Sequence, residues 1–84
     1  MGIGKKLKEM REAAGLSQKE VSQKLGWGTV QLVSNNERDI SLPPISCLSK
    51  LAKLYEVDET FLKTLVLNEN MRIFESKMKK RLKL

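Results

Sequence analysis

The stretch Leu16–Arg38 reads LSQKEVSQKLGWGTVQLVSNNER and indicates two short helices joined by a glycine-containing turn. The second of these helices would present polar side chains to the outside. Helices joined in this way form a helix-turn-helix, whose second helix can enter the major groove of DNA. The rest of the chain would then serve as the support of this stretch.

A capping box opens the first helix of this stretch. Ser17 and Glu20 stand three residues apart, so the Ser17 hydroxyl can accept the Glu20 amide hydrogen while the Glu20 carboxylate reaches back. Val21 and Leu25 would face inward. Gly26 would end the helix, because glycine readily takes the left-handed conformation found there.

The second helix is expected to begin after Gly28, with Thr29 as its N-cap. Val33 must point to the core, because Leu32 and Val33 are the only apolar residues in the middle of this helix. Three polar residues then face away from the core, namely Gln31, Ser34 and Asn35.

Helical spacing of apolar residues continues on both sides of the stretch. A preceding helix is predicted over about residues 3–14, with one apolar stripe and a closing Gly15. A following helix is predicted from Pro43 and Pro44 to about Glu56, and its inward-facing residues would be Leu48, Leu51, Ala52 and Tyr55. Asp58 would cap a fifth helix, whose buried face would comprise Phe61, Leu62 and Leu65.

Residues 68–84 would prolong the fifth helix, since they contain neither Gly nor Pro. Apolar residues recur there at nearly coiled-coil spacing over about two heptads: Leu67, Met71, Phe74, Met78 and Leu82. Such a helix could pack back on its own domain or pair two subunits, and we favour pairing because five helices already close the small core. We therefore divide the chain into a domain over residues 1–67 and a basic helical extension over residues 68–84.

The composition places the chain among small all-α domains. Its 84 residues include no histidine and a single cysteine, Cys47, so neither a structural zinc site nor an internal disulfide is expected. No cofactor or small-molecule ligand is evident. The sequence contains no apolar run long enough for a signal peptide or a membrane span, so we expect a soluble cytoplasmic protein.

The net charge of +6 is concentrated near the C-terminus. Five of the sixteen basic residues lie there: Lys77, Lys79, Lys80, Arg81 and Lys83. Without them, eleven basic residues stand against ten acidic ones, so the charge is compatible with DNA binding but is not evidence for it. The basic tail could be simply solvated, or it could lie on phosphates that flank a binding site.

The central residues resemble the Cro/CI-like, or XRE, helix-turn-helix family. The matching pattern is R-E-x-x-G-L-S-Q-x-E-V, then L-G, V-S-N-x-E-R, P-P and L-x-K-L-A-K-L-Y-x-V-D, between Arg11 and Asp58. It covers roughly residues 3–66 and says nothing about residues 68–84. The resemblance implies a five-helix, lambda-repressor-like domain that binds double-stranded DNA, commonly as a homodimer on a two-fold symmetric operator.

The sequence departs from the family pattern at three places. The turn Gly26–Thr29 looks one residue longer than in the shortest members. Asn36 replaces a large apolar residue, often Trp, so its side chain would either weaken the packing of the second helix or reach the DNA. Asp39 replaces the usual glycine after that helix, and aspartate tolerates the left-handed backbone better than most residues.

The resemblance also assigns roles to side chains. Gln18 would hold a phosphate together with the free amides at the start of its helix. The base-reading residues would be Thr29, Val30, Gln31, Ser34 and Asn35. Amide side chains can bond adenine at N6 and N7, and Val30 can contact a thymine methyl group; Gln31 is the foremost candidate.

Four further residues, Lys5, Lys6, Gly28 and Arg38, are predicted to contact the DNA backbone. By resemblance, Arg11 and Glu37 would form a partly buried ion pair that fixes the second helix more than it adds net stability. Trp27 would cover the core beneath the turn rather than touch DNA.

These observations predict a sequence-specific DNA-binding transcriptional regulator, most simply a small dimeric repressor. The alternative is an antitoxin-like factor that binds a partner protein through its C-terminal helix and regulates its own synthesis. An enzyme is disfavoured, because the sequence has no nucleophile–base constellation and no glycine-rich phosphate loop. An RNA reader would need exposed aromatic residues for stacking, and this sequence has few aromatic residues.

Overall fold

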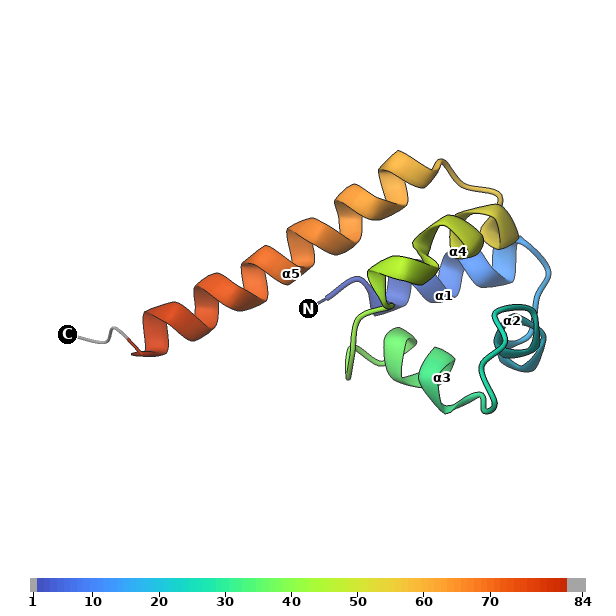
Figure 1. Cartoon of the computed structure of the whole chain (residues 1–84), viewed down its shortest axis with the longest axis horizontal. Coiled ribbons are helices and arrows are strands. Elements are labelled where there is room, and N and C mark those ends of the chain that lie inside the picture. Colours follow the sequence, from blue (N-terminus) through green and yellow to red (C-terminus); the bar gives the residue numbers. More distant parts are fainter. Residues whose placement is uncertain (1, 82–84) are drawn as a thin grey trace.

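Five α-helices and one 3₁₀ helix make up residues 2–81, the part of the chain that the computed structural model describes, with side chains through Lys79. They are α1 (Gly4–Ala13), α2 (Gln18–Lys24), α3 (Gln31–Glu37), the 3₁₀ helix η1 (Ile45–Cys47), α4 (Leu48–Tyr55) and α5 (Glu59–Arg81). The first four α-helices and the start of α5 form one body, from which the rest of α5 projects (Figure 1). The predicted all-α fold is confirmed.

The two ends of α2 form as the sequence predicts. The Ser17 hydroxyl accepts the Glu20 amide hydrogen at 3.0 Å, and the Ser17 amide donates to Glu20 Oε1 at 2.9 Å. The hydrogen bond from the Ser17 amide lowers the pKa of the Glu20 carboxyl. At the other end Gly26 has φ of 75°, and the Trp27 amide donates to the Ser22 carbonyl at 2.8 Å. Glycine adopts this left-handed conformation at the lowest cost, which explains the preference for it at the end of the helix.

Helix α3 begins one residue later than predicted. The position before its first residue is occupied by Val30, not by Thr29, so the assignment of Thr29 as N-cap was wrong. The Thr29 hydroxyl nevertheless accepts the amide hydrogen of Gln31 at 3.1 Å. It therefore still satisfies one of the free amides at the start of the helix.

The helix predicted after the two prolines is divided into two parts. Pro44 precedes η1, and α4 starts only at Leu48. The four residues of α4 that were predicted to face inward are all 5% exposed or less, so this prediction is confirmed: Leu48, Leu51, Ala52 and Tyr55. They pack with buried residues of the other helices into one core, comprising Ile3, Leu7, Val21, Leu25, Val33, Leu62 and Val66.

The buried face of α5 differs in part from the predicted one. Asp58 caps it as predicted, since its Oδ2 accepts the Phe61 amide hydrogen at 2.9 Å. Leu62 is fully buried, but Phe61 is 52% exposed and was wrongly assigned to the core. Val66, which the sequence analysis omitted, is 1% exposed. Residues four apart share a helix face, so Leu62 and Val66 point the same way while Phe61 lies about 100° around the axis.

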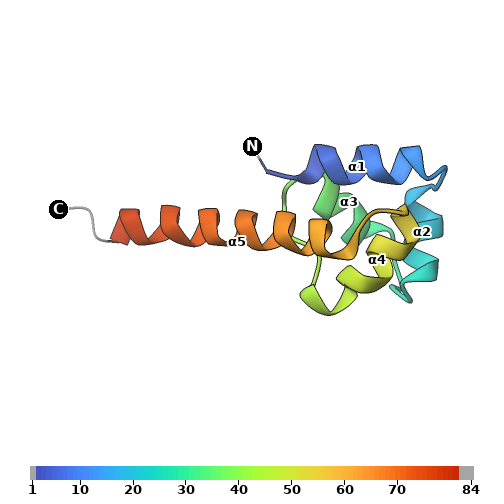
Figure 2. The ribbon, with the colours of Figure 1, turned by 90° about the horizontal axis from the view of Figure 1, so that it is seen from above.

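Helix α5 packs chiefly on α4 and runs without interruption through the predicted boundary between residues 67 and 68 (Figure 2). The division into a domain and an extension therefore stays a prediction. Within residues 2–81, none of the helices combines the length and the apolar character needed to cross a membrane.

Candidate nucleic-acid interface

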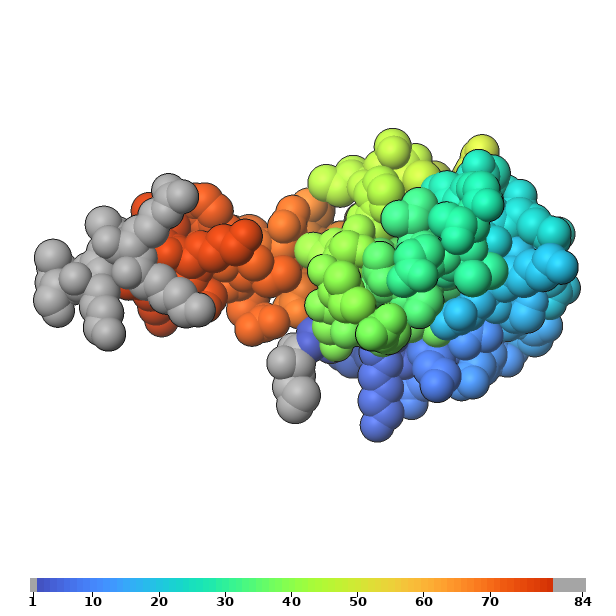
Figure 3. All heavy atoms as spheres, turned by 90° about the horizontal axis from the view of Figure 1, so that it is seen from below, coloured from blue at the N-terminus to red at the C-terminus, as the bar shows by residue number. Residues whose placement is uncertain are grey.

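Helices α2 and α3 share one face of the body. The first turns of α5 lie on the opposite side in Figure 1. Figure 3 looks onto the shared face, with α3 in green at its centre, α2 beside it and α1 along its lower edge. The elements of the motif are therefore accessible together, and the projecting part of α5 does not cover them.

The outward surface of α3 follows from the burial of two residues. Val33 is 2% exposed and Asn36 is 7% exposed, so they define the inner side of the helix. Among the predicted base readers, Thr29, Val30 and Gln31 are exposed, while Ser34 and Asn35 are half-buried. Leu32 is also 41% exposed on this surface, although the sequence analysis gave it no role. Its position next to the inward-facing Val33 is the signal that could have identified it.

Two of the predicted base readers contact each other. Gln31 Nε2 donates a hydrogen bond to Asn35 Oδ1 at 2.8 Å, across one turn of α3. This contact leaves Gln31 Oε1 as an acceptor and the Asn35 amide as a donor. An acceptor next to a donor is the arrangement that complements the major-groove edge of adenine.

An ion-pair network joins α1, α2 and α3. Arg11 Nε donates to Glu37 Oε2 at 2.6 Å, and Arg11 Nη2 donates to Glu37 Oε1 at 3.1 Å. Gln18 Nε2 donates to the same Glu37 Oε1 at 3.0 Å, and Arg11 Nη1 donates to the Leu16 carbonyl at 2.8 Å. The hydrogen bond to Glu37 raises the pKa of Arg11. The structure thus brings together three predicted site residues, and the contact between Gln18 and Glu37 was not predicted.

This network determines the charge of the interface. Glu37 is the only charged residue within α3, and its side chain is 4% exposed. The Arg11 side chain that pairs with it is 10% exposed. The outward surface of α3 therefore presents neutral side chains, and the one carboxylate that would repel a phosphate backbone is buried and paired.

The predicted backbone-contact residues surround α3. Lys5, Lys6, Gly28 and Arg38 are exposed. A β-carbon added to Gly4 would lie less than 3.0 Å from the Glu37 carbonyl oxygen, so the start of α1 adjoins the end of α3. Nothing would lie within 4 Å of a β-carbon at Gly28, so internal packing does not require glycine there. Whether these residues contact DNA stays a prediction.

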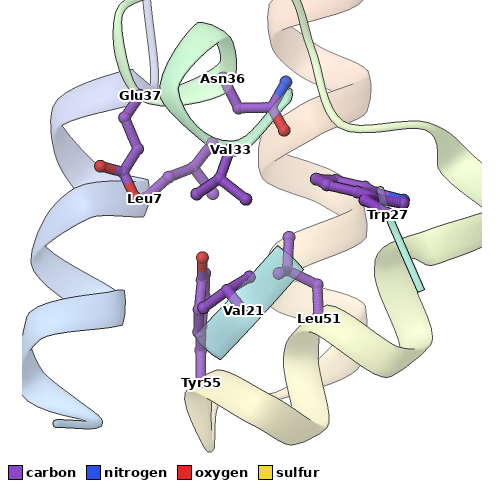
Figure 4. A pocket seen from close by; sticks show the side chains of 8 residues that line it. All are labelled: Leu7, Val21, Trp27, Val33, Asn36, Glu37, Leu51 and Tyr55. Carbon is purple, nitrogen blue, oxygen red and sulfur yellow. The ribbon is translucent and has the colours of Figure 1, made fainter. Parts of the chain in front are cut away.

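Asn36 points into the body and does not reach outward from α3, so of the two roles considered for it, contact with DNA is not supported. Its side chain is buried, and Nδ2 donates to the carbonyl and the hydroxyl oxygen of Ser41, at 3.2 and 3.1 Å. Figure 4 shows that Asn36 and Glu37 point to opposite sides of α3. The turn after α3 therefore supplies the partners of the polar residue that replaces the family's apolar one.

A small cavity lies beneath α3, with Trp27 at its edge and Tyr55 across from Asn36 and Glu37 (Figure 4). It measures about 10 Å³, which is room for about one water molecule and too little for a small-molecule ligand. Trp27 is half-buried and packs against the core, as predicted.

The residues predicted to pair subunits lie on the projecting part of α5. Leu67, Met71 and Phe74 are 46%, 62% and 63% exposed, and Met78 is half-buried. Leu82 lies outside the described residues. The side chains of Leu67, Met71, Phe74 and Met78 lie away from the α2–α3 face, and we call this row the outer stripe.

Comparison with known proteins agrees with this geometry. A family model described as helix-turn-helix matches residues 7–62, a range that contains α2, the turn and α3. The HTH-type transcriptional regulator ImmR of Bacillus subtilis (strain 168) is 47% identical over 62 residues, which is 74% of this chain and 48% of that protein. The chain therefore spans about half the length of this curated relative.

Proposed function

The chain belongs to the XRE-type helix-turn-helix family, and from this we propose that it is a transcriptional regulator that binds specific sequences in double-stranded DNA. The observation that carries the proposal is the outward surface of α3. It offers uncharged hydrogen-bonding and apolar side chains, while its one charge, Glu37, is buried against Arg11. Such a surface suits the reading of base edges between two phosphate backbones.

In this proposal α3 enters the major groove and α2 lies against the sugar–phosphate backbone. Gln31 and Asn35 read the bases, with Val30 in contact with a thymine methyl group. Gln18 already donates one amide hydrogen to Glu37, and its second amide hydrogen is available for a phosphate. The Arg11–Glu37–Gln18 network holds the three helices in register, so little ordering is required when DNA binds.

We further propose that the chain acts as a homodimer on a two-fold symmetric operator and represses transcription by occupying it. The outer stripe supports pairing. At about 100° per residue it lies roughly 140° around α5 from Leu62 and Val66, the residues that anchor the helix to the body. Two copies could therefore pair through the outer stripe while Leu62 and Val66 of each copy stay packed in its own core.

Changing Gln31 to Ala is expected to relax the choice of base at one or two positions of each half-site. The loss on the preferred sequence should be about 1–3 kcal/mol in binding free energy, because one amide–base contact is removed. Binding to the preferred duplex and to its single-base variants, measured by fluorescence anisotropy at fixed salt, checks this. Gln23→Ala, in an exposed glutamine of α2 without a proposed base contact, is the matched control. An equal loss on every duplex would contradict base reading by Gln31.

A further inference from the structure

Three segments meet where α5 leaves the body. They are the residues before α1, the turn after α3 and the third turn of α5 (Figures 1 and 2). We call this the polar junction, and its residues are Gly2, Gly4, Asp39, Glu69 and Arg72. The helix contacts of α5 are chiefly with α4, and its residues Leu62 and Val66 also belong to the common core. The polar junction is a further place, beyond the core, where α5 adjoins the α1–α3 half of the body.

Asp39 joins two of these segments. Its Oδ1 accepts the Gly4 amide hydrogen at 2.8 Å, across 35 positions of sequence. Ile3 occupies the N-cap position of α1 but has no polar side chain to accept a hydrogen bond from the first turn. Asp39 supplies that acceptor instead. Asp39 has φ of 61°, so it accepts an uncommon backbone conformation while it caps α1.

Gly2 lies next to both Asp39 and Glu69, so α5 adjoins the other two segments at this residue. A β-carbon added there would lie less than 3.0 Å from Asp39 Oδ1 and 2.7 Å from Glu69 Oε2, closer than real β-carbons approach such atoms. The carboxylates of Asp39 and Glu69 thus flank the backbone of Gly2. A side chain at this position would displace one or both carboxylates from their present places.

Glu69 is an unusual residue to find at this position, because it is charged and only 8% exposed. It is held by Arg72, whose Nε and Nη2 donate to its two carboxylate oxygens at 2.6 and 2.9 Å. These hydrogen bonds lower the pKa of Glu69 and raise the pKa of Arg72, and the charge of Asp39 adds to the effect on Arg72. The positive charge of Arg72 therefore interacts favourably with both carboxylates.

Because Glu69 lies where α5 leaves the body, a small change of helix direction at Glu69 moves the far end of α5 by several ångströms. Glu69 follows Leu62 and Val66 at intervals of four and three residues, so it extends the anchored face of the helix by one turn. From Glu69 to Arg81 the helix runs about 18 Å, at 1.5 Å per residue. A tilt of about 10° at Glu69 would move its far end by about 3 Å.

We propose that Glu69 is a positioning residue that sets the angle between α5 and the recognition helix α3. In the polar junction, Glu69 on the first projecting turn of α5 and Asp39 in the turn that directly follows α3 lie on either side of Gly2 and line one pocket. The effect on DNA binding rests on the proposed function. In a dimer joined through the outer stripe, the angle between α3 and α5 sets the distance between the two recognition helices, and this distance sets the preferred spacing of half-sites.

The angle can be measured in the full chain without DNA. Nitroxide labels on Gln31→Cys and Lys77→Cys, in a Cys47→Ser background, report the α3–α5 distance by pulsed electron paramagnetic resonance. An excess of unlabelled chain leaves at most one labelled copy in each dimer. Residue 77 lies about 12 Å beyond Glu69 along the helix, so a tilt of about 10° in Glu69→Ala is expected to broaden or shift the distance distribution by about 2 Å. Glu75→Gln, in an exposed glutamate of α5, is the control that should change nothing.

An unchanged distance distribution in Glu69→Ala, with the helical content of the parent chain, would overturn the proposal. If that variant loses helix, Glu69→Gln provides the same comparison with the size of the side chain preserved. The second readout uses unlabelled chains on duplexes whose half-sites differ in spacing by single base pairs. Glu69→Ala should weaken the spacing preference, whereas a change in stability alone would lower binding at all spacings equally. Absence of binding by the wild-type chain would refute the proposed function, and the label distances would still decide the role of Glu69.

Discussion

Changing Glu37 to Ala is expected to lower the free energy of unfolding by about 3–5 kcal/mol, the range for removing one partner of a buried ion pair. The substitution leaves the guanidinium of Arg11, whose side chain is only 10% exposed, without its carboxylate. It also removes the acceptor of the Gln18 amide. Urea unfolding followed by circular dichroism, with the matching Arg11→Ala and double variants, measures this cost and the coupling between the two side chains.

The double variant should be more stable than the sum of the single changes implies, because it leaves no uncompensated charge in the core. Lys63→Ala is the control, since Lys63 pairs with Glu59 at 2.7 Å while both side chains are more than 40% exposed. That change should cost less than about 1 kcal/mol. Additive losses for Arg11 and Glu37 would show that the pair does not act as a unit.

Changing Phe74 to Glu is expected to separate the proposed dimer and to reduce affinity for a two-half-site duplex about 100-fold or more. Phe74 is 63% exposed in the centre of the outer stripe, and a carboxylate there would have to be buried between two copies. A single copy also loses the gain that comes from binding two linked half-sites. Sedimentation equilibrium and fluorescence anisotropy measure the two effects.

Ser76→Glu is the control for this change, because it adds the same charge to the same turn of α5 on nearly the opposite side from the outer stripe. It should leave both the mass and the affinity close to those of the wild type. Equal masses for the wild type and Phe74→Glu would contradict pairing through the outer stripe. A stable partner protein recovered on that stripe would then favour the antitoxin-like alternative.

The elements that the sequence predicted well are those fixed by local interactions. The capping box at Ser17 and Glu20 and the cap at Asp58 depend on residues three apart, and both are present. The inner face of α4 follows from helical spacing alone. The start of α3 was misplaced because the Thr29 hydroxyl bonds the Gln31 amide from one position before the usual cap, which Val30 occupies.

The features that the sequence could not predict depend on contacts between distant segments. Asn36 finds its partner in Ser41, and Asp39 finds its partner in Gly4, so two departures from the family pattern are accommodated by hydrogen bonds. Glu69 would be placed on the surface by its charge, yet α5 buries it beside Gly2. Phe61 was assigned to the buried face of the fifth helix together with Leu62 and Leu65, although its position on the helix turns it outward.

Selection of bound duplexes from a random DNA pool tests the central proposal most directly, namely that α3 reads bases. We predict enrichment of two half-sites related by two-fold symmetry, with centres about 10 base pairs apart or a multiple of that distance. The same selection with Gln31→Ala should lose preference at one or two positions in each half-site. A wild-type pool with no enriched sequence would contradict the proposal.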